Sequence, residues 1–269
     1  MKEEHDPALA ALMEQISRAR GLCCSAYKVG CFKRRLTVRM RARGAATYPD
    51  YAHLLAEDPT EYDRLLDALT INVTRFYRNP ETWNVLAARM LPRLWAARAG
   101  AVRCWSAGCS SGEEPYTLAM LLADLARRGS DPVPAARVDA TDLDPQILEQ
   151  ARLGRYPRAM LREAPPDLIG RYFDAGDPAA VVPGVRDMVR FARHDLLRDP
   201  PPNPPYDLIL CRNVAIYFDR PSQDRLFAGL TAALTPDGYL VLGKVEAVWG
   251  EVRSQLALED LRERVYRRR

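Results

Sequence analysis

The spacing of hydrophobic and polar residues changes near Gly100. Before this point, apolar residues recur every three or four positions, the period of amphipathic helices, in PALAALMEQISRARG, CFKRRLTVRMRAR and YPDYAHLLAEDPTEYDRLLDALT. After it, short apolar runs that suit buried strands, AVRCWSA and ARVDATDLD, flank the helical pattern EEPYTLAMLLADLARRG. This order predicts a small helical module followed by an α/β domain.

Strand and helix patterns continue to alternate in the second half of the chain. A proline-rich loop leads into the apolar run YDLILC, PSQDRLFAGLTAAL is typical of a crossover helix, and LTPDGYLVLG supplies a late turn and strand. Residues 172–192 carry weaker helix signals and suggest a small β insertion. We therefore predict a helical, basic domain at residues 1–75 and a doubly wound, Rossmann-like domain at residues 76–269.

Composition and the first residues indicate in which compartment the protein is expected to act. Apolar residues make up 48% of the chain, but no apolar stretch approaches the roughly 18 residues that a membrane span needs. The N-terminus, MKEEHDPALAALMEQ, has acids where a signal peptide carries positive charge. The six cysteines show no zinc-ligand spacing, so we expect reduced thiols and no bound metal. We expect a cytoplasmic protein, take a monomer as the working assumption, and predict no membrane-spanning segment.

The basic residues are concentrated in the N-terminal part. The formal net charge is only +4, yet residues 18–43 contain many Lys and Arg residues and no acid. The amphipathic stretch in this segment has a basic side, with Lys33, Arg34, Arg35, Arg39 and Arg41 as candidate docking residues. An ordinary solvated helix face is an equally good interpretation. Because no nucleic-acid motif accompanies the charge, we expect an acidic protein surface, and no nucleic acid, as the partner.

The loop GCSSG follows the first strand of the α/β part, where a doubly wound fold binds a cofactor. A dinucleotide would place its pyrophosphate at the start of the next helix, but Glu113 and Glu114 occupy that start and would repel phosphate. Two carboxylates suit a cofactor without phosphate that carries positive charge, such as S-adenosylmethionine. Complementation of the helix dipole is the competing explanation. Asp142 and Asp144 end the second strand, where such folds place an acid on a ribose.

Several ordered segments resemble the chemotaxis receptor methyltransferases, the CheR family. These are LTINVTRFYRNPETW, CWSAGCSSGEEPYTLAMLLA, ATDLDPQILEQARLGRYP, HDLL, CRNVAIYFDRPSQDRLF and LTPDGYLVLG, which extend from residue 69 to residue 243. The resemblance implies O-methylation of glutamate side chains on the cytoplasmic helical bundle of chemoreceptors, with S-adenosylmethionine as donor and S-adenosylhomocysteine as product. Three positions depart from the family pattern: Tyr77 replaces a phenylalanine, Asp195 an asparagine and Lys244 a histidine.

The resemblance also implies which residues form the site. Those expected to bind the cofactor are Asn72, Thr74, Arg78, Gly108, Glu113, Glu114, Asp142, Asp195, Leu196, Asn213 and Val214. Among them Asp142 would hold the ribose, Asp195 and Leu196 would flank the adenine, and Asn213 and Val214 would line the methionine part. Arg78 and Tyr217 would face the transferred methyl group and the substrate carboxylate, and are the predicted catalytic residues.

Methyl transfer to a carboxylate agrees with these residue types. Because glutamate has an ordinary pKa of about 4.3, the nucleophile is already ionised and no general base is required. Arg78 can hold a carboxylate through paired hydrogen bonds, and the Tyr217 hydroxyl can orient it. Structural roles remain open for both, as an ion pair for Arg78 and a core aromatic for Tyr217. His194 is expected to be a loop histidine.

Two other functions remain open from the sequence. A methyltransferase acting on RNA or on a small molecule would also tolerate the basic helix. A non-catalytic module that binds S-adenosylmethionine and reports it to a partner would have no need for Arg78 and Tyr217 on the acceptor side.

Overall fold

The computed structural model describes residues 6–70, 73–98, 101–128 and 135–269. Within it the chain divides into two units. The first comprises Met1–Asn72 with Tyr217–Gln223, and the second comprises Val73–Ile216 with Asp224–Arg269. Each unit has its own core.

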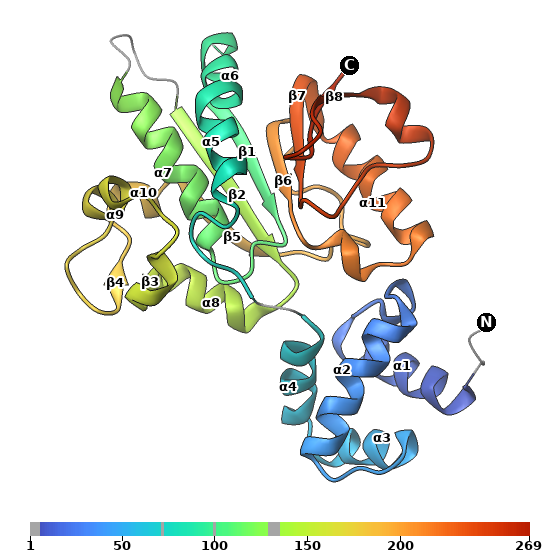
Figure 1. Ribbon diagram of the computed structural model, residues 1–269. Coiled ribbons are helices and arrows are strands. Elements are labelled where there is room, and N and C mark those ends of the chain that lie inside the picture. The colour runs from blue at the N-terminus through green and yellow to red at the C-terminus, as the bar shows by residue number, and fades with distance from the viewer. Residues whose placement is uncertain (1–5, 71–72, 99–100, 129–134) are drawn as a thin grey trace. The chain divides into compact units, whose positions relative to one another are not determined.

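The first unit is helical, as predicted, and Figure 1 shows its helices in blue and cyan. Its elements are α1 (Pro7–Arg20), the 3₁₀ turn η1 (Cys24–Ala26), α2 (Val29–Ala42), α3 (Tyr48–Glu57) and α4 (Thr60–Leu69). Asp6 caps the start of α1 by accepting the Ala8 and Leu9 N–H groups, and Gly21, which has a φ of 73°, caps its end. A capping box of Thr47 and Asp50 begins α3.

Apolar residues spaced at helical intervals meet in the core of this unit. They come from all four helices and are almost fully buried: Leu12, Ile16, Phe32, Leu36, Tyr51, Leu55 and Leu65. The predicted amphipathic pattern therefore corresponds to the packed faces of the helices.

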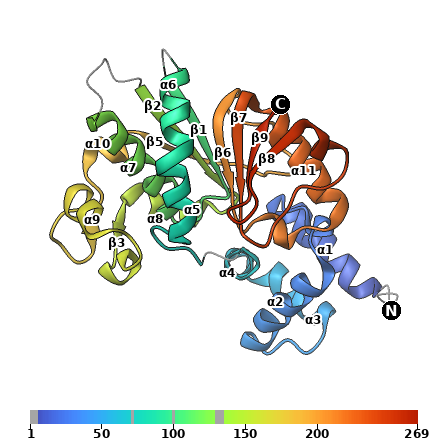
Figure 2. The same cartoon turned by 45° about the horizontal axis from the view of Figure 1, so that its top comes forward.

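The second unit contains a seven-stranded sheet with the order β5-β2-β1-β6-β7-β9-β8 (Figure 2). Its strands are β1 (Ala101–Ala107), β2 (Ala135–Asp142), β5 (Val189–Arg193), β6 (Tyr206–Cys211), β7 (Leu234–Leu242), β8 (Leu256–Asp260) and β9 (Val265–Arg268). The five strands from β5 to β7 pair in parallel, and β9 and β8 join antiparallel. The strand order reverses between β1 and β6, so this doubly wound sheet has its cofactor-binding switch point there.

Helices precede the first strand of this sheet and connect its later strands. They are α5 (Pro80–Val85), the π-helical turn η2 (Leu86–Met90), α6 (Leu91–Ala97), α7 (Glu113–Arg128), α8 (Pro145–Leu153), α9 (Pro166–Tyr172), α10 (Pro183–Arg186) and α11 (Arg220–Ala232). Trp83 of α5 and Leu118 and Leu122 of α7 are almost fully buried in one core with Val102 and Cys104 of β1. The predicted α/β class is confirmed.

A small insertion lies between α8 and β5. It contains a two-stranded antiparallel sheet of β3 (Arg155–Tyr156) and β4 (Ala179–Ala180), together with the 3₁₀ turn η3 (Arg158–Leu161). The segment predicted as the insertion, residues 172–192, holds β4 and α10, whereas its end belongs to β5 of the main sheet. Phe76 packs edge-on against Tyr156 and Phe173, which ties the insertion to the core.

In the described ranges, no helix combines the length and the apolar character that crossing a membrane would require.

Candidate functional site

Three strand ends converge at the switch point of the sheet. Gly108, at the end of β1, has a φ of +84°, and a Cβ atom added there would lie 2.5 Å from Val214 Cγ2. The loops after β1 and β6 are therefore in direct contact, and only glycine fits between them. The Gly108 and Cys109 N–H groups both donate to Thr141 O on β2, at 2.8 and 2.9 Å.

The two acids at the end of β2, Asp142 within the strand and Asp144 just after it, have separate roles. Asp144 is buried and caps α8, because its carboxylate accepts the Gln146 and Ile147 N–H groups at 2.9 and 3.3 Å. Asp142 faces the glycine loop instead and accepts the Ser110 N–H at 2.8 Å. Burial raises the Asp142 pKa, while the backbone N–H groups of Ser110 and Asp144 oppose that rise.

The two glutamates that begin α7 also differ. Glu113 has 0% exposure, and both of its carboxylate oxygens accept the Ser111 hydroxyl, at 2.8 and 2.7 Å. Burial raises the Glu113 pKa to about 7. Glu114 accepts the Ser106 hydroxyl at 2.8 Å and lies 3.3 Å from Arg212 Nη1. Burial raises the Glu114 pKa, and the positive charges of Arg212 and Arg78 act against that rise.

Arg212 joins the Glu114 carboxylate to the segment that contains Arg78. Its Nη2 atom donates to Arg78 O at 2.9 Å and to Asn79 Oδ1 at 3.1 Å, and its guanidinium lies 5.3 Å from the centre of the Trp83 ring. Our sequence reasoning missed this residue. A charged residue directly after the apolar run YDLILC was the available signal, because a buried arginine must be paired.

The segment before α5 carries two more predicted residues. The Arg78 side chain is partly exposed and donates from Nη1 to Val73 O at 3.1 Å. Thr74 is also partly exposed, and Asn72 lies outside the described residues. Arg78 therefore meets Arg212 through its backbone carbonyl, and the positive charge of its partly exposed guanidinium also acts on Glu114.

Asn213 occupies the start of the loop after β6. Its backbone is left-handed, with a φ of 61°, and its N–H donates to the buried Glu246 carboxylate at 2.8 Å. Its side-chain Oδ1 atom is buried and finds no hydrogen-bond partner among the described residues. An unsatisfied buried amide oxygen is costly unless a ligand donates to it.

The loop after β5 approaches Asp142 through its backbone. The His194 N–H donates to Asp142 O at 2.9 Å. Asp195 and Leu196 follow and are half-buried, and Asp195 Oδ1 accepts the Leu197 N–H at 2.9 Å. The His194 ring lies edge-on to Trp105 of β1, and its Nε2 atom is 2.9 Å from Pro200 O. These contacts indicate a structural role for His194.

Tyr217 belongs to the first unit, whereas Arg78 belongs to the second. It ends the 3₁₀ turn η4 (Ala215–Tyr217), and its carbonyl accepts the Lys28 N–H at 2.9 Å. The Arg35 guanidinium lies 5.4 Å from the centre of the Tyr217 ring.

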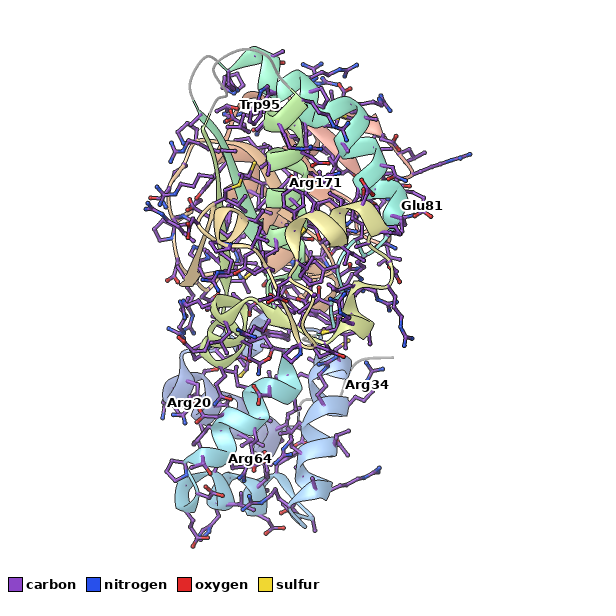
Figure 3. The ribbon with its side chains drawn as sticks, turned by 90° about the vertical axis from the view of Figure 1, so that its left-hand side faces the viewer. Arg20, Arg34, Arg64, Glu81, Trp95 and Arg171 are labelled. Carbon is purple, nitrogen blue, oxygen red and sulfur yellow. The ribbon has the colours of Figure 1, made fainter. Side chains whose placement is uncertain are left out.

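The predicted docking residues of α2 divide into two groups. Arg39 donates to both oxygens of the fully buried Glu61, at 2.7 to 2.9 Å, and Arg35 donates to the Ala68 and Leu69 carbonyls at the end of α4. The side chains in the second group form no hydrogen bond or ion pair with other described residues. These are Lys33, Arg34 and Arg41. Figure 3 labels Arg34 on α2.

Lys244, one of the departures from the family pattern, is paired inside the second unit. Its Nζ atom lies 3.0 Å from Glu81 Oε2 at the start of α5 and 3.5 Å from Glu263 Oε1. Figure 3 shows Glu81 at the edge of the unit. The described side chains contain no group of three His, Cys, Asp or Glu residues arranged to hold a metal ion.

The donor set at the switch point fits a cationic cofactor without phosphate. It combines an unpaired amide oxygen at Asn213, carboxylates at Glu114 and Asp142, and a glycine loop with no room for a side chain. The fold and these groups define a methyltransferase of the S-adenosylmethionine-dependent class. In agreement, residues 72–264 match the family described as CheR methyltransferase, SAM binding domain, and residues 7–70 match the CheR methyltransferase all-alpha domain. The chain therefore belongs to the CheR family of chemotaxis methyltransferases, as the sequence resemblance predicts.

Individual relatives agree with this assignment. The chain is 34% identical over 235 residues to a chemotaxis protein methyltransferase of Listeria monocytogenes, covering 87% of each protein. It is 34% identical over 249 residues to the chemotaxis protein methyltransferase of Escherichia coli strain K12, covering 90% of this chain and 84% of the relative. An uncharacterised 104.1 kDa protein of Rhodobacter capsulatus is 34% identical over 96% of this chain, which spans 27% of that protein.

Proposed function

We propose that this protein transfers the methyl group of S-adenosylmethionine to glutamate side chains on the cytoplasmic helical bundle of chemoreceptors. It would act in the cytoplasm, as a monomer. The observation that carries this proposal is the convergence of Glu114, Asp142 and the unpaired Asn213 amide oxygen at the switch point of the sheet. This donor set occurs in a chain whose family acts in chemotaxis.

The residues at the switch point would hold separate parts of the cofactor. When bound, S-adenosylmethionine supplies an electrophilic methyl group on a sulfonium. Asp142 would accept hydrogen bonds from the ribose hydroxyls, and Asp195 and Leu196 would flank the adenine. Asn213 Oδ1 and Glu114 would accept from the ammonium group of the methionine part.

Other residues would shape the pocket. Glu113 would act through Ser111. Both Glu113 carboxylate oxygens accept the Ser111 hydroxyl, and this would keep the glycine loop in place. Gly108 and Val214 would close the two loops on the cofactor. Thr74 and Arg78 would complete the pocket from the segment before α5.

Arg78 and Tyr217 would act on the acceptor. A glutamate carboxylate is ionised at neutral pH, so the protein must hold and desolvate it and need not remove a proton. The Arg78 guanidinium is partly exposed and can take a carboxylate through two parallel hydrogen bonds. The family resemblance assigns the Tyr217 hydroxyl to orienting the acceptor. Catalysis would then consist mainly of alignment, which can supply several kcal/mol of the barrier reduction.

The surface of α2 would recognise the receptor. Lys33, Arg34 and Arg41 have no partner among the described residues, and Val38 between them is 60% exposed. A basic face with an apolar centre suits an acidic amphipathic helix. Arg35 and Arg39 would hold the fold of the unit, since their guanidinium groups are bonded within it.

Two measurements test the proposed function. Titration calorimetry with S-adenosylmethionine and S-adenosylhomocysteine should show binding that Asp142→Ala and Glu114→Ala each weaken by at least tenfold. The control is Asp187→Ala, an exposed acid of the same unit. Radiolabelled methyl transfer should then occur to a receptor cytoplasmic fragment and disappear when its acceptor glutamates are replaced by alanine.

Each rival function has its own outcome in these assays. Transfer to RNA or to a small molecule, and none to the receptor fragment, would replace the substrate. Cofactor binding without transfer to any of these would favour a sensor module. A folded wild-type protein that binds neither compound would overturn the methyltransferase mechanism.

A further inference from the structure

A buried glutamate that the proposed mechanism does not use lies between the loops that follow β6 and β7. Glu246 is 4% exposed and follows β7 in the turn that begins at Gly243. Its carboxylate accepts the Gly243 N–H at 2.6 Å and the Asn213 N–H at 2.8 Å on Oε2, and the Ile216 N–H at 3.2 Å on Oε1. No Lys or Arg side chain of the described residues forms an ion pair with it.

A buried carboxylate held only by backbone N–H groups is unusual, because burial strongly disfavours a charge that has no cationic partner. Burial accordingly raises the Glu246 pKa, while the amides of Asn213, Gly243, Ile216 and Val214 act in the opposite direction. All of these amides belong to the two loops that leave the neighbouring parallel strands β6 and β7. The contacts of Glu246 are therefore confined to the junction of these loops.

The junction is tight. Asn213 has a φ of 61°, a left-handed backbone that asparagine adopts more readily than most residues with a side chain. A Cβ atom on Gly243 would lie 2.7 Å from Glu246 Oε2 and 2.9 Å from Asn213 N. The left-handed turn at Asn213 is thus held by its hydrogen bond to Glu246. Position 243 has no room for a side chain.

The loop held in this way carries groups of the proposed site. Asn213 provides the unpaired Oδ1 atom, and the next residue, Val214, touches the Gly108 loop. Ile216, the third residue bonded to Glu246, directly precedes Tyr217. One carboxylate therefore contacts both ends of the short segment that joins the cofactor contacts to the predicted catalytic tyrosine.

We propose that Glu246 is a positioning residue for methyl transfer, an inference that rests on the function proposed above. Its carboxylate fixes residues 213–216, so that Asn213 and Val214 meet the cofactor. It contacts neither substrate nor cofactor itself. A change of about 1 Å in such a loop can cost about a hundredfold in rate without unfolding the protein.

Glu246→Gln is the most informative variant because it keeps the size of the side chain. Its amide oxygen can still accept from Asn213 and Gly243, but its NH₂ group then faces the Ile216 N–H, donor against donor. We expect the Ile216 end of the loop to shift. The result should be a 10- to 100-fold lower kcat for receptor methylation, with S-adenosylhomocysteine affinity changed less than about threefold.

Asp207→Asn is the matched control. Asp207 is another buried carboxylate, 3% exposed, that holds the Arg103 N–H on β1 and the Arg98 side chain. It lies in β6 ahead of the loop, so its variant should lose thermal stability yet keep kcat. If Glu246→Gln lowered kcat no more than Asp207→Asn does, when both are assayed well below their melting temperatures, Glu246 would be structural only and the positioning role would be wrong.

A second variant covers failure of Glu246→Gln to fold. Gly243→Ala keeps the Glu246 carboxyl group but pushes it out of the junction and away from Asn213, so a fall in kcat together with weaker S-adenosylhomocysteine binding is expected. Full activity of a folded Gly243→Ala protein would also overturn the role. Failure of the proposed function is distinguishable, because the wild type would then methylate no receptor. In that case weaker S-adenosylhomocysteine binding by Glu246→Ala than by Asp207→Asn would still support the loop-holding role, and equal binding would end it.

Discussion

Arg212 Nη1 and Glu114 Oε2 lie 3.3 Å apart, with only 3% and 13% of their side chains exposed. The pair joins the end of β6 to the start of α7, and the same guanidinium holds the Arg78 carbonyl. Removing one partner of such a pair leaves a buried charge unpaired, whereas the intact pair need contribute little net stability.

Arg212→Ala should therefore destabilise the second unit and weaken cofactor binding together. We expect a loss of about 3 kcal/mol in the free energy of unfolding, from chemical denaturation, and at least a tenfold weaker S-adenosylhomocysteine affinity, from calorimetry. Arg89→Ala is the control, because Arg89 forms an exposed ion pair with Asp260. Equal losses of stability and of affinity in the two variants would mean that the buried Arg212–Glu114 pair matters no more than an exposed one.

Gly108→Ala should close the cofactor pocket. The new methyl group would need the space 2.5 Å from Val214 Cγ2, so the β1 and β6 loops must separate. We expect at least a tenfold loss of S-adenosylhomocysteine affinity. Gly44→Ala shares the positive φ, +71° against +84°, but its Cβ would meet nothing within 4 Å. It should show only the backbone cost of about 1 kcal/mol. Unchanged affinity in Gly108→Ala would contradict the close approach of the loops.

Glu113 should make stability depend on pH. Its pKa is raised from an unfolded value of about 4.5 to about 7, so the native state holds a proton that the unfolded state has lost between these values. Stability due to this group is therefore highest below pH 4.5 and falls as pH rises to about 7. Glu113→Gln, which mimics the protonated form, should gain on the order of 1–3 kcal/mol relative to wild type between pH 5 and pH 8 in urea denaturation. Glu149→Gln, an exposed change, should show no such trend. A constant difference across pH would show that Glu113 does not titrate in this range.

Charge reversal on α2 should affect the receptor and not the cofactor. Arg34→Glu and Arg41→Glu are expected to raise KM for a receptor fragment by about tenfold, more at low salt than at high salt, with S-adenosylhomocysteine affinity unchanged. Arg190→Glu on β5 reverses an exposed charge of the second unit and serves as the control. Equal effects of all three variants would mean that net charge matters and the position on α2 does not.

Local sequence patterns were sufficient to predict the helices and strands but not the contacts between residues far apart in the sequence. The helices of the first unit and the β1–loop–α7 segment follow from residue spacing, since amphipathic periods and glycine loops are short-range features. Asp142 could be expected at the end of β2 for the same reason. The Arg212 contacts could not, because Glu114 and Arg78 are 98 and 134 residues away in the sequence.

The basic segment shows the limit of charge patterns in another way. Its five candidate docking residues are equivalent in the sequence, yet Arg39 meets Glu61 from α4 and Arg35 meets the last carbonyls of the same helix. Tertiary pairing decides which charges remain for a partner. The predicted β insertion was misjudged in extent for a similar reason: the partner of β4 lies upstream at Arg155–Tyr156.

The pairing of Arg39 with Glu61 also affects how a complex would form. Glu61 is fully buried and accepts from Tyr51, Arg39 and Arg43, so α2 is fastened to α3 and α4 before any partner arrives. Lys33, Arg34 and Arg41 then project from a helix that does not have to order on association, and little backbone entropy is lost at that step. Ionic strength should accordingly change the rate at which the receptor is captured far more than the lifetime of the complex.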